Sequence, residues 1–126
     1  MSDKPPISPS LAAEMLAEFE KEWRKELRRS IPVKDRMKIG RQPMPQRPAE
    51  ERRRDFDEVN SGLGPEEAMA EARRCLDCAK PACITGCPVR IDIPSFVKLV
   101  EKGEFAAAAA KIREANSLPA VCGRVC

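Results

Sequence analysis

Four cysteines lie within thirteen residues of one another, and no other feature of the sequence constrains the fold as strongly. Their spacing is C-x2-C-x4-C-x3-C, and a proline follows the last of them. These residues are Cys75, Cys78, Cys83, Cys87 and Pro88. A thin apolar core does not need so many thiols in one short segment. We therefore interpret the run as a metal centre.

The rest of the chain offers little material for a large apolar core. Leu, Ile, Val and Phe together make up 25 of the 126 residues, which is close to the composition at which ordered structure becomes doubtful. The net charge is only +3, and this argues against full disorder. We therefore expect the cysteine site to help to hold the fold.

Several classes of protein are excluded by what the sequence lacks. No apolar run approaches the roughly 20 residues of a membrane span, and the charged first 30 residues do not look like a signal peptide. We therefore expect a cytoplasmic protein, in which cysteines are metal ligands or redox centres rather than disulfides. The absence of His excludes His-ligated zinc and any Ser–His or Cys–His catalytic pair. There is also no G-x-G-x-x-G or P-loop motif.

Composition divides the chain into an N-terminal arm (residues 1–30), a linker (31–63) and a compact domain (64–126). The arm is predicted to be an amphipathic helix, because apolar residues recur every four positions from Leu11 to Leu27. The linker is predicted to be extended, since four prolines interrupt it.

The linker also holds a short basic run at residues 52–54. Acidic residues flank the run on both sides and cancel most of its field, so we expect a solvated surface and no nucleic-acid partner. We expect Phe56 and Val59 to anchor this segment on a core.

The compact domain is predicted to be entirely helical. Helices are expected over residues 65–74, from Ile93 to a C-cap at Gly103, over 104–115, and from Leu118 onward. No stretch alternates as a strand would, so the fold class is a small all-α domain with a helical arm and an extended linker.

Two kinds of metal site fit the cysteine run. A zinc ion with four thiolates commonly uses C-x2-C pairs, but the two pairs usually lie on separate knuckles. A bacterial ferredoxin run is C-x2-C-x2-C-x3-C-P, whose fourth Cys binds a second cluster. The present run has two more residues in its middle spacing but keeps the x3-C-P ending, so we favour iron–sulfur clusters. The alternative is a non-redox interaction domain stapled by one zinc ion.

Two further cysteines, Cys122 and Cys126, are spaced so that they share one face of a helix. Together with the run they provide more thiols than a single zinc ion needs, which again favours clusters. Three thiols for one cluster and two for another leave both ligand sets incomplete. We therefore expect this chain to be a piece of a longer protein.

The sequence also indicates roles for charged residues near the cysteines. Asp77 and Asp92 are interpreted as loop and helix-cap residues. Four basic residues lie close to cysteines in sequence and are candidates for stabilising anionic clusters: Arg74, Lys80, Arg90 and Arg124. No residue is predicted to act in acid–base catalysis.

Five segments together resemble a known module. They are residues 55–60 (DFDEVN), 72–78 (ARRCLDC), 83–89 (CITGCPV), 91–96 (IDIPSF) and 116–126 (NSLPAVCGRVC). The module is the N-terminal iron–sulfur domain of the glutamate synthase small-subunit family. That family also includes the large subunit of electron-bifurcating NADH-dependent ferredoxin:NADP oxidoreductase, and the N-terminal part of dihydropyrimidine dehydrogenase is similar.

This resemblance implies an α-helical, ferredoxin-like domain with two [4Fe–4S] clusters. Cys75, Cys78 and Cys83 would hold the first cluster, and Cys87 and Cys126 would contribute to the second. The remaining ligands, and the FAD and NAD(P)H domains, lie downstream in the family. The whole protein would be an NAD(P)H-dependent oxidoreductase in which the clusters relay electrons between FAD and a redox centre of a partner subunit. The resemblance assigns no role to Cys122.

Overall fold

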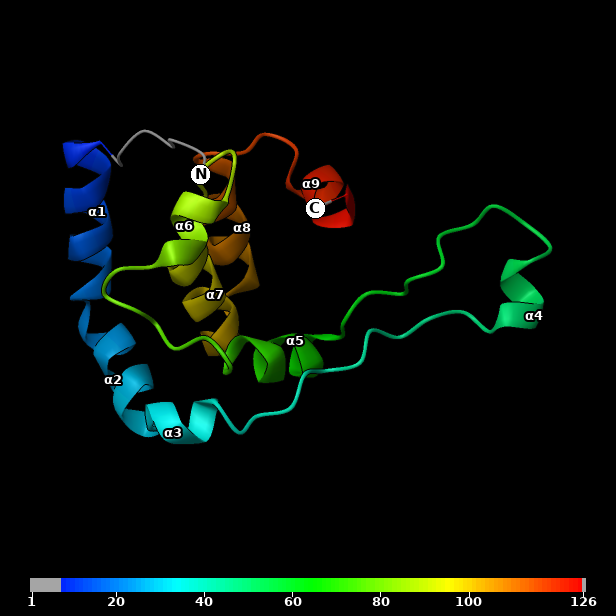
Figure 1. Ribbon diagram of the computed structural model, residues 1–126, viewed down its shortest axis with the longest axis horizontal. Helices are drawn as coiled ribbons and strands as arrows, with labels where there is room; N and C mark the ends of the chain where they lie inside the picture. Colours follow the sequence, from blue (N-terminus) through cyan, green and yellow to red (C-terminus); the bar gives the residue numbers. More distant parts are fainter. Residues whose placement is uncertain (1–7, 126) are drawn as a thin grey trace.

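A computed structural model describes residues 8–125 and shows an all-helical protein over that range (Figure 1). Within these residues there are nine helices and no β-strand. The helices are α1 (Pro9–Phe19), α2 (Glu22–Ser30), α3 (Val33–Arg36), α4 (Ala49–Arg52), α5 (Pro65–Ala72), α6 (Ala82–Gly86), α7 (Ile93–Lys102), α8 (Phe105–Arg113) and α9 (Pro119–Val125). The predicted all-α fold is confirmed. None of the helices in the described range is long and apolar enough to cross a membrane.

The described part of the predicted arm forms two helices instead of one. α1 begins after Ser8, whose hydroxyl accepts a hydrogen bond from the N–H of Leu11 at 3.3 Å. The helix ends at Phe19 with Glu20 as its C-cap, and Lys21 then leaves the helical region with φ −58° and ψ 136°. The break redirects the chain, so that α2 and α3 continue along the lower left of the molecule in Figure 1. Apolar spacing alone does not reveal such a break.

Between α3 and α5 the chain leaves the helical body and returns to it, with α4 at the far end (Figure 1). The two passes are joined by an antiparallel bridge between Gln46 and Asn60, and the N–H of Arg47 donates to the carbonyl of Val59 at 2.9 Å. Phe56 is fully exposed, at 107% of its reference area. The prediction that Phe56 anchors this segment on a core is therefore wrong.

Local capping chemistry sets the helix ends in the compact part. The N–H of Gly64 donates to the carboxylate of Glu67 at 2.7 Å and closes the start of α5. Asp92 caps α7 by accepting from the N–H of Ser95, and α7 ends at Gly103 in the left-handed region, with φ 85°. The predicted helix starts and the predicted C-cap are confirmed. α7 packs against both α5 and α8 and forms the centre of the body.

The buried interior is more polar than apolar. Among the described residues the buried apolar side chains are Ala72, Ile84 and Ala108. The buried polar or charged ones are Arg24, Arg36, Asp77, Asp92, Ser95, Lys98, Glu101 and Asn116. Charged residues are rarely buried unless they are paired, so ionic contacts must do in this protein part of what apolar packing does elsewhere. This agrees with the low content of large apolar residues.

Candidate metal centre

The cysteine run lies in the segment between α5 and α7. Cys75 and Cys78 are in the loop before α6, Cys83 is in α6, and Cys87 is the C-cap of that helix. The short helix α6 was not predicted, because five residues inside a cysteine run carry no helical period. Cys126 lies outside the described residues, so the structure does not place this predicted ligand.

The first three cysteines of the run influence one another electrostatically. Burial raises the pKa of the Cys75 thiol, and the neighbouring Asp77 and Cys78 raise it further. Burial also raises the pKa of Cys83, and the thiols of Cys75 and Cys78 add to that effect. Such mutual effects require the three thiols to lie near one another. A cationic cofactor would relieve the repulsion among their thiolates.

Backbone N–H groups of the same segment point at the sulfur atoms. The N–H of Asp77 donates to the sulfur of Cys75, and the N–H groups of Cys83 and Ile84 donate to the sulfur of Cys83. These hydrogen bonds favour the thiolate over the thiol. Asp77 reaches its place because its backbone is left-handed, with φ 52°. N–H donors to sulfur are one means by which proteins tune iron–sulfur clusters.

Within residues 8–125, no group of three or more Cys, Asp or Glu side chains is gathered closely enough to bind a single metal ion. In a [4Fe–4S] cluster each thiolate binds a different iron atom, and the donors of the cysteine segment suit that arrangement. The residues present therefore fit the cluster: three thiols share one segment that also supplies N–H donors to sulfur.

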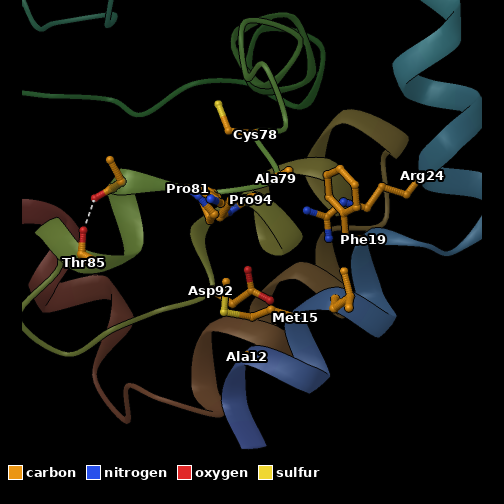
Figure 2. A pocket seen from close by; sticks show the side chains of 13 residues that line it. Ala12, Met15, Phe19, Arg24, Cys78, Ala79, Pro81, Thr85, Asp92 and Pro94 are labelled. Atoms are coloured by element: carbon orange, nitrogen blue, oxygen red, sulfur yellow. Dashed lines mark hydrogen bonds between the residues drawn. The ribbon is translucent and has the colours of Figure 1, made fainter. Parts of the chain in front are cut away.

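A cavity of about 500 Å³ opens beside the cysteine segment, between α1 and residues 78–85 (Figure 2). Cys78 lies at its edge, and Phe19 and Met15 of α1 line the other side. Asp92 also lines it, and one of its carboxylate oxygens is buried without a hydrogen-bond partner among the described residues. The N-terminal arm therefore forms one wall of the space next to the predicted cluster ligands.

Asp77 is the member of the cysteine run whose role the sequence missed. Its carboxylate is buried and accepts hydrogen bonds from Arg24 (Nη2–Oδ1 2.6 Å) and from Arg28 (Nη1–Oδ2 2.8 Å), both in α2. Arg24 also donates to Ser95 of α7 at 2.7 Å. Burial raises the pKa of Asp77, but the two arginines outweigh it and hold the pKa below its usual value. Asp77 is a loop residue, as predicted, and it is also the anchor of the arm.

A second buried carboxylate has the same arrangement. Glu101 of α7 binds Arg36 of α3 (Nη2–Oε1 2.9 Å) and Lys98 of α7 (Nζ–Oε2 2.6 Å). Both cations also donate to the backbone carbonyl of Cys75, Lys98 at 3.0 Å and Arg36 at 3.5 Å. We call the Arg24–Asp77–Arg28 group the first triad and the Arg36–Glu101–Lys98 group the second triad.

The basic residues singled out from the sequence behave differently. Arg74 binds the carboxylate of Glu71, and Arg124 binds that of Glu58 at 2.6 Å. Lys80 is exposed to solvent. The buried cations beside the run are instead Arg24, Arg36 and Lys98, none of which the sequence singled out.

Residues 52–126 match the family described as dihydropyrimidine dehydrogenase domain II, 4Fe-4S cluster. The chain belongs to this family. The match includes the whole cysteine run and Cys126. Helices α1, α2 and α3 lie before the matched range, and α4 ends at its first residue, Arg52. The prediction of a 4Fe-4S domain is thereby confirmed, and the zinc alternative is not favoured.

Similar proteins agree with the resemblance noted in the sequence. The chain is 43% identical over 88 residues to the glutamate synthase [NADPH] small chain of Halomonas elongata. The aligned residues make up 70% of this chain and 19% of that protein. It is 41% identical over 80 residues to the same enzyme subunit of Azospirillum brasilense (64% and 17% covered). It is also 43% identical over 71 residues to the NAD-dependent dihydropyrimidine dehydrogenase subunit PreT of Salmonella typhimurium (56% and 17% covered). The chain therefore spans less than a fifth of the length of these relatives.

Proposed function

We propose that this chain is the electron-transfer module of an NAD(P)H-dependent oxidoreductase of the glutamate synthase small-chain type. The observation that carries the proposal is the cysteine run, which lies within residues matched to a 4Fe-4S family and whose first three thiols lie together in one segment. The names of the similar proteins, which are small chains or subunits of NAD(P)H enzymes, support the reaction class.

In this proposal Cys75, Cys78 and Cys83 bind one [4Fe–4S] cluster, and Cys87 and Cys126 contribute two ligands to a second. The clusters would supply one-electron transfer. The segment 75–87 would hold the first cluster through its thiolates and direct N–H donors at the sulfur atoms. Segments outside this chain would complete the ligand sets.

The partners follow from the same proposal. FAD-binding and NAD(P)H-binding domains would belong to the same protein, since this chain, which contains no nucleotide-binding motif, spans less than a fifth of the length of its relatives. Electrons would pass between FAD and a redox centre of a partner subunit. The cytoplasm, where thiols stay reduced, suits this chemistry.

The test is a measurement of iron and acid-labile sulfide, together with visible and EPR spectra, on protein that extends past Cys126 to include the remaining ligands and is purified without oxygen. We expect iron and sulfide in equal amounts and the broad visible absorption of a [4Fe–4S] cluster. Cys75→Ser, Cys78→Ser and Cys83→Ser should each lose the same cluster signal. Cys122→Ser is the matched control and should retain it.

Two results would contradict the proposal. One is stoichiometric zinc without iron in anaerobically purified protein. The other is full retention of iron and of the EPR signal in all three serine variants, which would move the first cluster away from these cysteines. A loss of signal in Cys122→Ser would instead add Cys122 to the ligands.

A further inference from the structure

The two triads place an excess of buried positive charge against the cysteine segment. Each consists of one carboxylate between two cations, so each carries a net charge of +1. The carboxylates are buried, as are three of the four cations; the fourth, Arg28, has 23% of its side chain exposed. Charges that are shielded from water interact more strongly and over longer distances than exposed ones.

The second triad is in direct contact with a predicted cluster ligand. The carbonyl of Cys75 accepts a hydrogen bond from Lys98 at 3.0 Å and lies 3.5 Å from Nη1 of Arg36. Lys98 is completely buried, with 0% of its surface exposed. No other lysine among the described residues is buried.

The first triad contacts the same segment through Asp77. Asp77 lies between Cys75 and Cys78, and its two arginine partners come from α2. Three of the four cations, Arg24, Arg28 and Arg36, therefore belong to residues that precede the part of the chain matched to the family. The N-terminal helices contribute charge to a site whose cysteines they do not contain.

We propose that Lys98 and Arg36 are positioning residues that raise the reduction potential of the cluster bound by Cys75, with Glu101 holding both in place. A [4Fe–4S] cluster with four thiolates is anionic and gains one more negative charge on reduction. A buried cation nearby stabilises the reduced state more than the oxidised state. This inference rests on the proposed function, because it requires the cluster on Cys75, Cys78 and Cys83.

The test is the midpoint potential of that cluster, measured by EPR-monitored redox titration of the cluster-loaded protein. The relevant signal is the one that disappears in Cys78→Ser. Lys98→Met removes one charge and keeps the length of the side chain. At a fixed solution potential we expect the ratio of reduced to oxidised cluster to fall about tenfold, which is about 59 mV for a one-electron couple.

Two other variants distinguish an electrostatic effect from a structural one. Glu101→Gln removes the negative charge of the second triad while keeping its shape, so the potential should shift in the positive direction. Lys102→Met lies one turn further along α7, where the side chain is 40% exposed and pairs with Glu104, and it should leave the potential unchanged. A general loosening of the site would instead shift the reduction potentials of Lys98→Met and Glu101→Gln in the same direction. If Lys98→Met does not fold, the sign of the Glu101→Gln shift decides.

The redox titration has three outcomes that decide between these interpretations. Shifts of opposite sign in Lys98→Met and Glu101→Gln support the proposal. A cluster whose potential moves no more in these variants than in Lys102→Met overturns it and leaves the proposed function intact. Protein extended past Cys126, so that the ligand sets are complete, overturns the proposed function and this inference together if it shows no cluster after anaerobic reconstitution.

Discussion

Arg24 and Asp77 are 53 residues apart in sequence, yet they form a buried ion pair in which the arginine donates through both Nε and Nη2. The guanidinium also lies over the ring of Phe19, with its carbon 5.5 Å from the ring centre. The pair joins α2 to the loop between Cys75 and Cys78. It therefore connects the N-terminal arm to the predicted cluster site.

We expect Asp77→Asn to release the arm and to destabilise the protein. The substitution leaves Arg24 and Arg28 without their common counter-ion, and breaking a buried ion pair typically costs about 3–5 kcal/mol. Urea unfolding of the full chain measures the loss. Limited trypsin digestion should also cut faster within α2. Arg29→Met, on the same helix but exposed, is the control and should change stability by less than about 1 kcal/mol. An unchanged unfolding midpoint in Asp77→Asn would contradict this role.

The end of α7 gives a second prediction. Gly103 has φ 85°, a conformation that residues with a Cβ adopt only at a cost, and an added Cβ would lie 3.6 Å from the sulfur of Met69. There is room for the methyl group, so the cost should come from the backbone alone. We expect Gly103→Ala to lower the free energy of unfolding by about 1–2 kcal/mol. Gly40→Ala, with open space and no positive φ, is the matched control. Equal stability of the two variants would show that the backbone conformation carries no penalty.

The Arg24–Asp77 pair and the cap at Gly103 differ in how far the sequence predicts them. Caps such as Asp92 and Gly103 depend on neighbours within a few residues, so the sequence predicts them. The cysteine run is equally local, because its spacing reflects the shape of what it binds. The Arg24–Asp77 pair has no such signature: an arginine among charged neighbours on an amphipathic helix looks like a solvated residue. Lys98 was missed for the same reason, since only tertiary packing brings it to Cys75.

The exposed Arg47–Asp55 pair predicts a pH effect. The guanidinium donates to both carboxylate oxygens at 2.7 Å, and this hydrogen bonding lowers the pKa of Asp55 to about 2 from the ordinary value of 3.8. Because the folded-state pKa is lowered, the pair stabilises the segment that runs from residue 46 through α4 to residue 60, above about pH 4. That contribution is lost as the pH falls from about 3.8 through about 2.

Carbon-detected NMR titration of the Asp55 carboxyl checks this prediction. We expect a midpoint near 2 in the wild-type protein and a return toward 3.8 in Arg47→Met. Lys38→Met removes an exposed cation from another segment and is the control, which should leave the Asp55 midpoint unchanged. A midpoint for Asp55 that is the same with and without Arg47 would show that the pair does not form in solution.

A double-mutant cycle tests whether the arm and α7 are coupled through Arg24. Its Nη1 donates to Ser95 Oγ at 2.7 Å in a buried setting, so Ser95→Ala leaves a buried donor without a partner and should cost about 1–3 kcal/mol. Arg24→Met removes both the donor and the charge. The combined variant should be less destabilised than the sum of the two single ones, by about 0.5–3 kcal/mol. Ser30→Ala, whose exposed hydroxyl donates only to the carbonyl of Leu27, is the control partner and should be additive with Arg24→Met. Strict additivity between Arg24 and Ser95 would mean that α2 and α7 do not share this contact.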